Sequence, residues 1–552
     1  MKEWSRKVYV ELPRPCEEDH RSMQKRLLAA LRDCGSFYTG DSQSVFSHVV
    51  RDEADIRIRP AVLNDCLAIC EQADWQVTAS LGFDGRVWEL LALEPGDTAA
   101  QHYGLCADLG STTIIMELVD LNTGETLASE SVFNPQIAYG DDILTRIFYT
   151  KDHPERRREL QEATAKGFRK LMVQLSKETG VDTRKCNILT VAGNTTMMHF
   201  LLGLDAFGVF QSPYAVQTLE PEVCRGAELG IPVQGFVYLC PAMENYLGGD
   251  IISGMLATGL PDREEISVFL DVGTNGELVV GNQEFLLAGA GAAGPALEGG
   301  SVRTGMRAEN GAVDSVTTEN GRLKAHVIGE TEAKGICGSG IVDLLAELYL
   351  NGWIDLRGRF QEAEIRTEES RDEDEKEKLR IPGLKKLPMR DAASEKDMEY
   401  AIEYAQGLYF YQSDIDEFIR TKAAAMTMVE YMMNLIGLGM EDVGRFYVAG
   451  AFGTHIDKES AVTIGMYPDI DRDKIISPGN TSLQGAKKLL LDRSLTEKAE
   501  EIIERMQYVQ FGAVEEFIEL MRAAQAIPHT DLQRFPTVER RLLERQAAKA
   551  EK

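Results

Sequence analysis

The sequence lacks the long apolar runs and ligand spacings that mark several common protein classes. No uninterrupted apolar run approaches the roughly 18 residues needed to cross a bilayer. The histidines are scattered without an H-E-x-x-H spacing, and there is no G-x-x-x-x-G-K-[ST] phosphate loop. Segment 1–11 has mixed charge and none of the apolar character of a signal peptide. We therefore predict a cytoplasmic protein without a membrane segment or a P-loop.

Closely spaced cysteines are also missing. The chain has nine, and all stand far apart except Cys66 and Cys70, which lie in a segment with helical spacing, 60–73. An odd number of scattered cysteines does not indicate a disulfide framework, and no C-x₂-C pair of the iron–sulfur or zinc type occurs. We predict no iron–sulfur cluster in this chain and expect the cysteines to be small buried side chains.

Positive charge is scarce relative to negative charge. The 552 residues include 59 Lys and Arg against 88 Asp and Glu, so the formal net charge is −29. A surface field of this sign does not hold nucleic acid or an anionic membrane, and we exclude both as partners. It does not exclude one nucleotide held by local backbone donors. Hydrophobic residues make up 44% of the chain, which is ample for a globular core.

Hydrophobic periodicity predicts a small α+β domain over 1–97, followed by a larger α/β domain over 98–530 in which strands alternate with helices. The highly charged segment 362–380 is expected to be a solvated loop or exposed helix. The Arg-, Glu- and Ala-rich segment 531–552 is expected to be an exposed helical tail.

Two segments of the larger domain resemble each other. Both 105–120 and 269–283 run from an apolar strand through Asp-x-Gly and small polar residues into a second strand. Their separation is too long for a solenoid repeat and suits a duplicated fold. We therefore predict two similar halves, at roughly 103–265 and 266–530.

The first of these segments contains a candidate phosphate-binding hairpin. Asp108 ends an apolar strand, and Gly110, Ser111, Thr112 and Thr113 follow it. Glycine permits close approach of a phosphate to the main chain, and the carboxylate can hold Mg²⁺ through water. Taken alone, the segment can equally be an ordinary tight turn.

The second hairpin repeats this pattern over 271–277. Its candidate residues are Asp271, Gly273, Thr274, Asn275, Gly276 and Glu277. Asp271 is the second candidate for Mg²⁺ through water, and Glu277 is available to the metal shell or to an attacking water. Two such hairpins could hold the β- and γ-phosphates of one nucleotide from opposite sides.

Further small-residue segments could complete a nucleotide site. In 446–456, Gly450 and Gly453 would let a base and ribose lie against the backbone, or would simply bend a buried strand. Gly193 and Asn194 follow an apolar strand and open a helix, so their amides face a common end.

Asp250 could serve a metal or a water, or could cap the helix that follows it. The glycine-dense loops 289–300, with Gly294, and 335–340, with Gly338 and Gly340, suit phosphate or ribose hydroxyls. Cys337, in the second of these loops, is expected to be a small packing residue.

These segments resemble a known superfamily. The hairpins and the glycine strand resemble the two phosphate motifs and the adenosine motif of acetate and sugar kinases, heat-shock-cognate chaperones and actin. More specific segments resemble the reductive activators of corrinoid proteins, which act beside cobalamin-dependent methyltransferases of anaerobes. These segments are Asn134-Pro135-Gln136, Tyr139-Gly140-Asp141-Asp142, Gly193-Asn194-Thr195-Thr196-Met197, Ala293-Gly294-Pro295-Ala296-Leu297-Glu298-Gly299, Gly335-Ile336-Cys337-Gly338-Ser339-Gly340 and Gly479-Asn480. The resemblance covers about residues 103–525 and, more weakly, 1–97, which resembles the family's middle domain.

The resemblance implies a duplicated actin-like, ribonuclease H-like ATPase with ATP and Mg²⁺ as cofactors. It implies an activator that supports reduction of cob(II)alamin to cob(I)alamin on a corrinoid protein. Family members carry an iron–sulfur module ligated by closely spaced cysteines, and this chain shows no such run. We therefore expect a separate ferredoxin-like protein to supply the electron.

Two alternatives on the same fold stay open. One is a small-molecule kinase, with Asp250 or Asp271 as the base for a substrate hydroxyl or carboxylate. The other is a non-catalytic, ATP-gated module that binds a corrinoid protein. The sequence also leaves open whether the protein is a homodimer.

Overall fold

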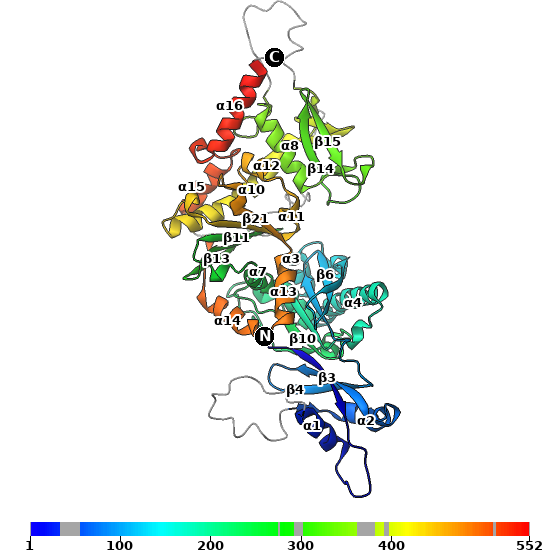
Figure 1. The fold of residues 1–552 in the computed structure, drawn as a ribbon. Coiled ribbons are helices and arrows are strands. Elements are labelled where there is room, and N and C mark those ends of the chain that lie inside the picture. The colour runs from blue at the N-terminus through cyan, green and yellow to red at the C-terminus, as the bar shows by residue number, and fades with distance from the viewer. Residues whose placement is uncertain are drawn as a thin grey trace, which may run out of the picture. The chain divides into compact units, whose positions relative to one another are not determined.

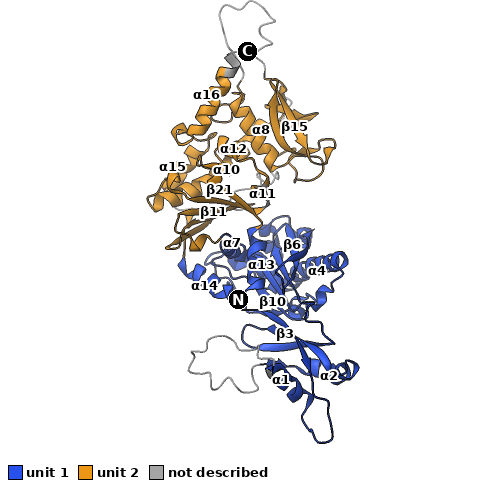
Figure 2. Ribbon diagram, viewed as in Figure 1, with its two compact units in different colours: residues 1–258, 481–505 blue, residues 259–480, 506–552 orange. Residues whose placement is uncertain are grey.

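A computed structural model describes residues 2–33, 56–273, 276–291, 302–361, 381–390, 397–511 and 515–550. The chain divides into two compact units, which are treated separately (Figure 2). Unit 1 comprises 1–258 and 481–505, and unit 2 comprises 259–480 and 506–552. Segment 481–505 thus belongs to unit 1, although the predicted half 266–530 contains it. The charged segment 362–380 lies outside the described residues.

The N-terminal part of unit 1 is a four-stranded sheet with two helices, as expected for a small α+β domain. In spatial order its strands are β1 (Ser5–Glu11), β3 (Gln76–Phe83), β4 (Trp88–Pro95) and β2 (Ile56–Ile58). The helices are α1 (Met23–Asp33) and α2 (Pro60–Gln72). Helix α2 buries Cys66 and Cys70 and starts with Pro60, a residue favoured at the first helical position.

Short polar bonds join this domain to the rest of unit 1. The indole N–H of Trp4 donates to the carbonyl of Leu489 at 2.8 Å. The Ser5 hydroxyl lies 2.8 Å from His102 Nε2 and accepts a hydrogen bond of 3.0 Å from the side-chain amide of Asn187. The four side chains that form these bonds, those of Trp4, Ser5, His102 and Asn187, are all buried.

The central sheet of unit 1 has six strands (Figure 1). In spatial order they are β7 (Thr126–Phe133), β6 (Thr113–Asp120), β5 (Tyr103–Leu109), β8 (Ile188–Gly193), β10 (Phe236–Leu239) and β9 (Cys224–Arg225). Strands β7, β6 and β5 pair antiparallel with one another, whereas β5, β8 and β10 pair parallel with one another. Parallel strands end at one edge of a sheet, and that edge carries the predicted site residues of unit 1.

Helices cover both faces of this sheet. Helix α4 (Pro154–Thr179) packs on β6 and β7, whereas α13 (Thr481–Leu491) packs on β5 and β8 and against α7 (Gly249–Thr258) (Figure 1). The remaining helices of unit 1 are α3 (Ile143–Thr150), α5 (Thr195–Leu202), α6 (Phe207–Phe210) and α14 (Leu495–Arg505). The apolar side chains of β5, β6 and β8 are buried beneath them.

Unit 2 repeats this topology. Its six-stranded sheet has the order β21 (Ile475–Gly479), β20 (Arg445–Ala449), β11 (Ser267–Val272), β12 (Gly276–Gly281), β13 (Leu286–Gly291) and β22 (Met506–Tyr508). Strands β11, β12 and β13 form an antiparallel meander, and β20 and β21 continue the sheet in parallel from β11. The duplicated α/β fold predicted from the two Asp-x-Gly segments is therefore confirmed.

Unit 2 also holds two three-stranded sheets. They consist of β15 (Arg322–Val327), β14 (Ala312–Glu319) and β16 (Gly335–Ile336), and of β17 (Leu384–Pro388), β18 (Met398–Ala405) and β19 (Leu408–Tyr411). The helices are α8 (Gly338–Leu350), α10 (Gln412–Leu435), α11 (Gly450–His455), α12 (Lys458–Thr463), α15 (Glu515–Ala524) and α16 (Pro536–Ala550). The predicted tail contains α16, yet it is not wholly exposed, because Phe535 and Val538 are buried and Arg545 pairs with Glu347 at 2.7 Å.

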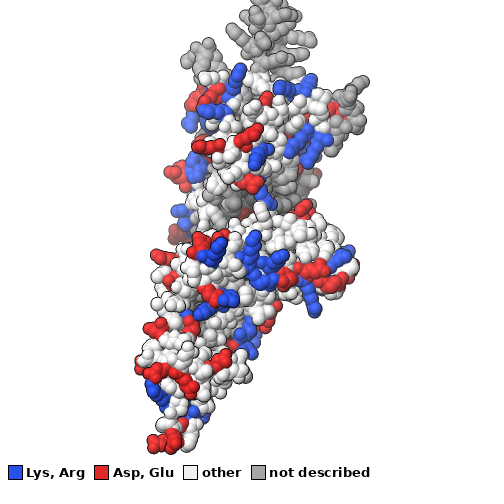
Figure 3. All heavy atoms as spheres, turned by 90° about the vertical axis from the view of Figure 1, so that its right-hand side faces the viewer, with Lys and Arg blue, Asp and Glu red and all other residues white. Residues whose placement is uncertain are grey.

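The excess of acidic residues does not form one continuous patch on the face shown in Figure 3, where acidic and basic side chains are interspersed. In the parts of the chain that the structure describes, none of the helices combines the length and the apolar character needed to cross a bilayer.

Candidate nucleotide site

The first predicted hairpin lies at the edge of the unit 1 sheet where the parallel strands end. Asp108 is opposite Ile115 of β6 on one side and Ala192 of β8 on the other. The Ser482 hydroxyl, at the start of α13, donates a hydrogen bond of 2.8 Å to Asp108 Oδ1. Asp108 is half-buried, as are the residues of the turn. Its carboxylate is therefore oriented from outside the hairpin.

Three carbonyl groups of this turn face the body of unit 1, and the fourth, that of Thr113, accepts a hydrogen bond of 3.1 Å from the Gly110 N–H. The Asn134 side-chain amide donates to the Gly110 carbonyl at 2.9 Å, and the Asn134 backbone N–H donates to the Thr112 carbonyl at 2.8 Å. Arg146 Nη1 donates to the Ser111 carbonyl at 2.7 Å. In a planar trans peptide the N–H points opposite to the C=O. The N–H groups of the three following residues, 111–113, therefore point away from Asn134 and Arg146.

The fourth predicted segment lies beside this hairpin. Gly193 pairs with Leu109, and a Cβ at Gly193 would lie 2.7 Å from the Leu109 carbonyl oxygen. The Asn194 side chain caps α5 by accepting a hydrogen bond of 2.9 Å from the Met197 N–H. His199 is buried, with Nδ1 2.7 Å from the Thr195 carbonyl oxygen, and burial lowers its pKa. It is a core residue.

Asp250 lies in the first turn of α7, and its Oδ1 accepts a hydrogen bond of 2.9 Å from the Ile251 N–H. Gly248 brings α7 close to α5, because a Cβ there would lie 2.4 Å from the Asn194 Cα. Unit 1 thus brings together Asp108, the 110–113 turn, Asn194 and Asp250. A direct role of Asp250 toward a metal stays a prediction.

In unit 2, Asp271 lies beside the glycine strand. It is opposite Ala449 of β20 and Glu277 of β12. Gly450 follows with φ +85°, and a Cβ added there would lie 3.0 Å from Asp271 Oδ1. Gly273 and Gly276 flank the hairpin turn. Thr274, Asn275 and Gly294 lie outside the described residues, so their predicted roles stay predictions.

Three other predicted glycines belong to unit 2. A Cβ at Gly453 would lie 2.4 Å from the Val448 carbonyl oxygen, and a Cβ at Gly340 would lie 2.4 Å from that of Val313. Gly338 begins α8, with Cys337 as a buried N-cap residue. Backbone packing therefore explains Gly340 and Gly453, and a ligand role for either is an additional prediction.

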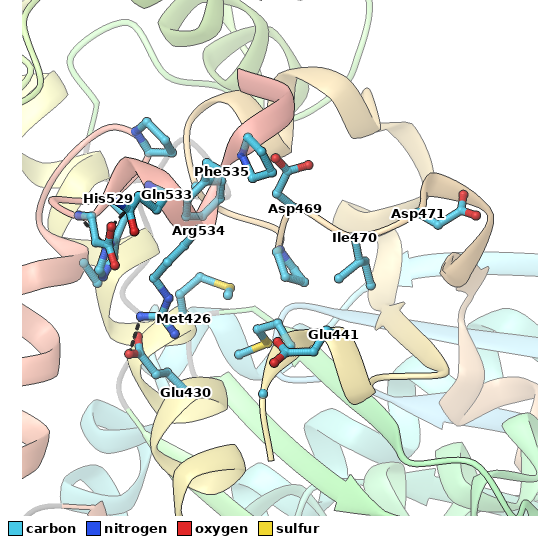
Figure 4. A pocket seen from close by; sticks show the side chains of 18 of the residues that line it. Met426, Glu430, Glu441, Asp469, Ile470, Asp471, His529, Gln533, Arg534 and Phe535 are labelled. Carbon is cyan, nitrogen blue, oxygen red and sulfur yellow. Dashed lines mark hydrogen bonds and ion pairs between the residues drawn. The ribbon is translucent and has the colours of Figure 1, made fainter. Parts of the chain in front are cut away.

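A cavity of about 700 Å³ lies elsewhere in unit 2 (Figure 4). Met426 and Glu430 of α10 form one wall, and Glu430 pairs with Arg534 at 2.5 Å. Met440, just before β20, and Lys474, just before β21, also line it. Gly450 follows the opposite end of β20, where Ala449 pairs with Asp271 of β11, so roughly 15 Å of strand separates both residues from the cavity. This cavity is not the predicted nucleotide site.

Sequence reasoning assigned no role to Asn134, Arg146 or Ser482, the residues that hold Asp108 and its turn. Asn134 belongs to a segment that resembles the family, and this resemblance was the sequence feature that could have indicated its role. Ser482 is far from Asp108 along the chain, and no local sequence pattern connects the two residues. Within the described residues, no group of three His, Cys, Asp or Glu side chains is arranged to hold a metal ion, so Mg²⁺ binding through water at Asp108 and Asp271 stays a prediction.

Comparisons with known proteins account for nearly all of the sequence. Three family models match: the RACo linker region at residues 1–100, the RACo middle region at 103–263 and the C-terminal ASKHA domain of RACo at 265–539. A solved structure of a "Reductive activator for corrinoid,iron-sulfur protein" matches 97% of the chain and 81% of its own, with 32% identity and a TM-score of 0.80. The chain belongs to the RACo family.

Membership of this family confirms the actin-like fold class, because ASKHA domains are the acetate and sugar kinase, heat-shock-cognate and actin class. It also corrects one assignment. Residues 1–97 match the family's linker region, whereas the middle region is the first half of the duplicated fold. A small α+β pattern indicates a separate domain but does not identify which family region it represents.

Two curated relatives carry functional names. "Corrinoid activation enzyme RamQ" of Eubacterium limosum is 31% identical over 402 residues, which are 71% of this chain and 64% of the relative. "[Co(II) methylated amine-specific corrinoid protein] reductase" of Methanosarcina barkeri is 24% identical over 440 residues, 73% of each chain. The chain thus spans just under two thirds of the length of RamQ.

Proposed function

We propose that this protein is an ATP-dependent activator of a corrinoid protein in a methyltransferase system. The observation that carries the proposal is the match of 97% of the chain to a reductive activator at 32% identity and a TM-score of 0.80. The names of both curated relatives support the same activity. We further propose that the protein works in the cytoplasm of an anaerobe.

The described residues fit ATP and Mg²⁺. Asn134 and Arg146 donate hydrogen bonds to carbonyl groups of the turn after Asp108 and hold them toward the body of unit 1. The N–H groups of the same peptides therefore point outward and suit phosphate oxygens. Gly450 has φ +85°, a conformation that favours glycine, and a Cβ there would lie 3.0 Å from Asp271 Oδ1, so the residue suits a close ligand approach. Carboxylate oxygens, together with water, are the ligands that Mg²⁺ prefers.

We propose distinct roles for these residues. Ser111, Thr112 and Thr113 bind phosphate oxygens through N–H and hydroxyl groups, and Gly193 and Asn194 border the same edge of the unit 1 sheet. Asp108 and Asp271 hold metal-bound water, and Glu277 or Asp250 orients the attacking water. Bound ATP supplies the free energy of its hydrolysis to ADP and phosphate. The remaining proposed contacts are Gly273, Thr274, Asn275, Gly276, Gly294, Gly338, Gly340, Gly450 and Gly453.

The reaction served is a one-electron reduction on the partner protein. Cob(II)alamin takes up one electron and becomes cob(I)alamin, and we propose that a separate ferredoxin-like protein supplies that electron. ATP binding and hydrolysis favour a conformation of the activator–corrinoid protein complex in which the unfavourable electron transfer proceeds.

Measurement of ATP turnover with and without a purified corrinoid protein tests this proposal. We expect the corrinoid protein, but not serum albumin, to bind the chain and increase release of inorganic phosphate. Stoichiometric phosphorylation of a metabolite instead would identify a small-molecule kinase. ATP binding without turnover, even with the partner bound, would identify a non-catalytic gated module. Either result contradicts the proposed ATPase.

A further inference from the structure

Arg146 is a fully buried arginine directly behind the first phosphate hairpin. It lies on α3 with none of its surface exposed. Its Nε donates to the Gly140 carbonyl at 2.8 Å, and its Nη1 donates to the Ser111 carbonyl at 2.7 Å. Nη1 also lies 3.4 Å from Gln136 Oε1. The guanidinium therefore reaches from a helix to the middle of the turn.

Among the described residues, no carboxylate pairs directly with the positive charge of this side chain, although Asp141 and Asp142 are near enough to offset part of the effect of burial on its pKa. The Nη2 atom of Arg146 is buried without a hydrogen-bond partner. Burial lowers its pKa to about 10, so the guanidinium stays protonated at neutral pH. Burying a charge without a counter-ion is costly.

The surrounding side chains hold Arg146 in place. Gln136 Nε2 donates to Thr164 Oγ1 at 2.6 Å and thereby anchors its own carbonyl group near Arg146. Asn134 caps the short helix Pro135–Tyr139 and also binds the turn. One of the segments that resemble the corrinoid activators, Asn134-Pro135-Gln136, thus surrounds the guanidinium.

We propose that Arg146 is a positioning residue for nucleotide phosphates, acting through the Ser111–Thr112 peptide. Its hydrogen bond holds the Ser111 carbonyl inward, so the Thr112 N–H faces outward. Its charge lies behind the turn and attracts an anion in front of it. This inference rests on the proposed binding of ATP by the hairpin.

The arrangement explains how a chain with a net charge of −29 could bind a polyanion without a basic residue in the binding turn. A cation in contact with a carbonyl oxygen polarises the peptide and strengthens the N–H at its other end. Because the attraction grows with ligand charge, Arg146 should matter more for ATP than for AMP.

Calorimetric titration of the full chain with MgATP and with AMP tests the inference. Arg146→Gln keeps a donor for the Ser111 carbonyl but removes the charge, whereas Arg146→Lys keeps the charge but loses the planar fork. We expect Arg146→Gln to weaken ATP binding by about tenfold and AMP binding much less, with Arg146→Lys between wild type and Arg146→Gln. Arg156→Gln is the matched control, because Arg156 also donates to a backbone carbonyl, that of Tyr149 at 3.1 Å, but away from the turn.

Equal loss of ATP and AMP binding in a folded Arg146→Gln variant would overturn the inference, because it indicates a merely structural role. Unchanged ATP binding would overturn it as well. If Arg146→Gln does not fold, the ratio of ATP to AMP affinity is measured on Arg146→Lys, and an equal loss of both affinities in that variant would likewise overturn the inference. If the wild-type chain binds ATP but the Arg146 variants lose ATP and AMP affinity equally, this inference is wrong and the proposed function is unaffected. If the wild-type chain binds no ATP, the proposed function fails first.

Discussion

Ser482 donates a hydrogen bond of 2.8 Å to the carboxylate of Asp108, although 374 positions separate the two residues. The bond exists because the chain returns to unit 1 after completing the unit 2 sheet, and α13 then packs on β5 and β8. A helix from the end of the chain thereby orients the acidic residue of the first hairpin.

We predict that Ser482→Ala weakens MgATP binding by about fivefold, the equivalent of one hydrogen bond of roughly 1 kcal/mol. The reason is that Asp108 loses a donor that orients its carboxylate. Calorimetric titration measures the effect. The control is Ser176→Ala, which removes a half-buried hydroxyl of α4 that hydrogen-bonds to Thr183 just beyond that helix. Equal affinities of Ser482→Ala and wild type would contradict the assigned geometry.

We predict that Asp108→Asn and Asp271→Asn each abolish ATP turnover and shift the melting temperature by only a few degrees. Asparagine keeps the shape and hydrogen-bond acceptor of the side chain but lacks the charge required near Mg²⁺. Phosphate release and thermal unfolding provide the two measurements. A variant that fails to fold would show that its aspartate has a structural role and would remove it from the proposed site.

Gly450→Ala should reduce both stability and nucleotide affinity. Its φ of +85° costs an alanine on the order of 1 kcal/mol, and the new Cβ would press on Asp271. Gly437→Ala is the matched control, because Gly437 has φ +68° but nothing within 4 Å of an added Cβ. We expect Gly437→Ala to lose stability alone. If both variants bind ATP equally well, Gly450 is not part of the site.

Acidification should weaken the attachment of the N-terminal domain through His102. Burial lowers the pKa of this imidazole to about 4, against an ordinary value of 6.5. Between these two pH values the unfolded chain binds a proton that the folded chain does not, so stability falls as pH decreases from 6.5 to 4.

We therefore expect the wild-type chain to lose on the order of 1–2 kcal/mol more than His102→Gln when the pH falls from 6.5 to 5. Urea denaturation at both pH values measures this difference, in which the contributions of other titrating groups largely cancel. Identical pH dependence of the two proteins would show that His102 is not the responsible group.

Local sequence patterns predicted the two hairpins well. An apolar run followed by Asp-x-Gly specifies a strand and a turn within a few residues, and β5 accordingly ends at Leu109 while β6 begins at Thr113. The duplication was visible for the same reason, since both halves repeat this local pattern.

The supports of the hairpin could not be predicted in this way. Arg146 lies in a short helix between acidic and apolar residues, where an arginine usually faces solvent. Its burial depends on how α3 packs behind the turn. Ser482 likewise depends on the return of the chain to unit 1. Such contacts come from tertiary packing and leave no periodic signal along the sequence.

We propose that ATP and this chain together allow a corrinoid protein to reach the cob(I) state. The most direct measurement is the absorbance change of a purified cob(II) corrinoid protein mixed with the chain, Ti(III) citrate as reductant, and Mg²⁺ with or without ATP. We predict conversion to cob(I)alamin only when both ATP and the chain are present, and none with Asp108→Asn. Conversion at the same rate without ATP, or no conversion and no complex with any corrinoid protein, would contradict the account.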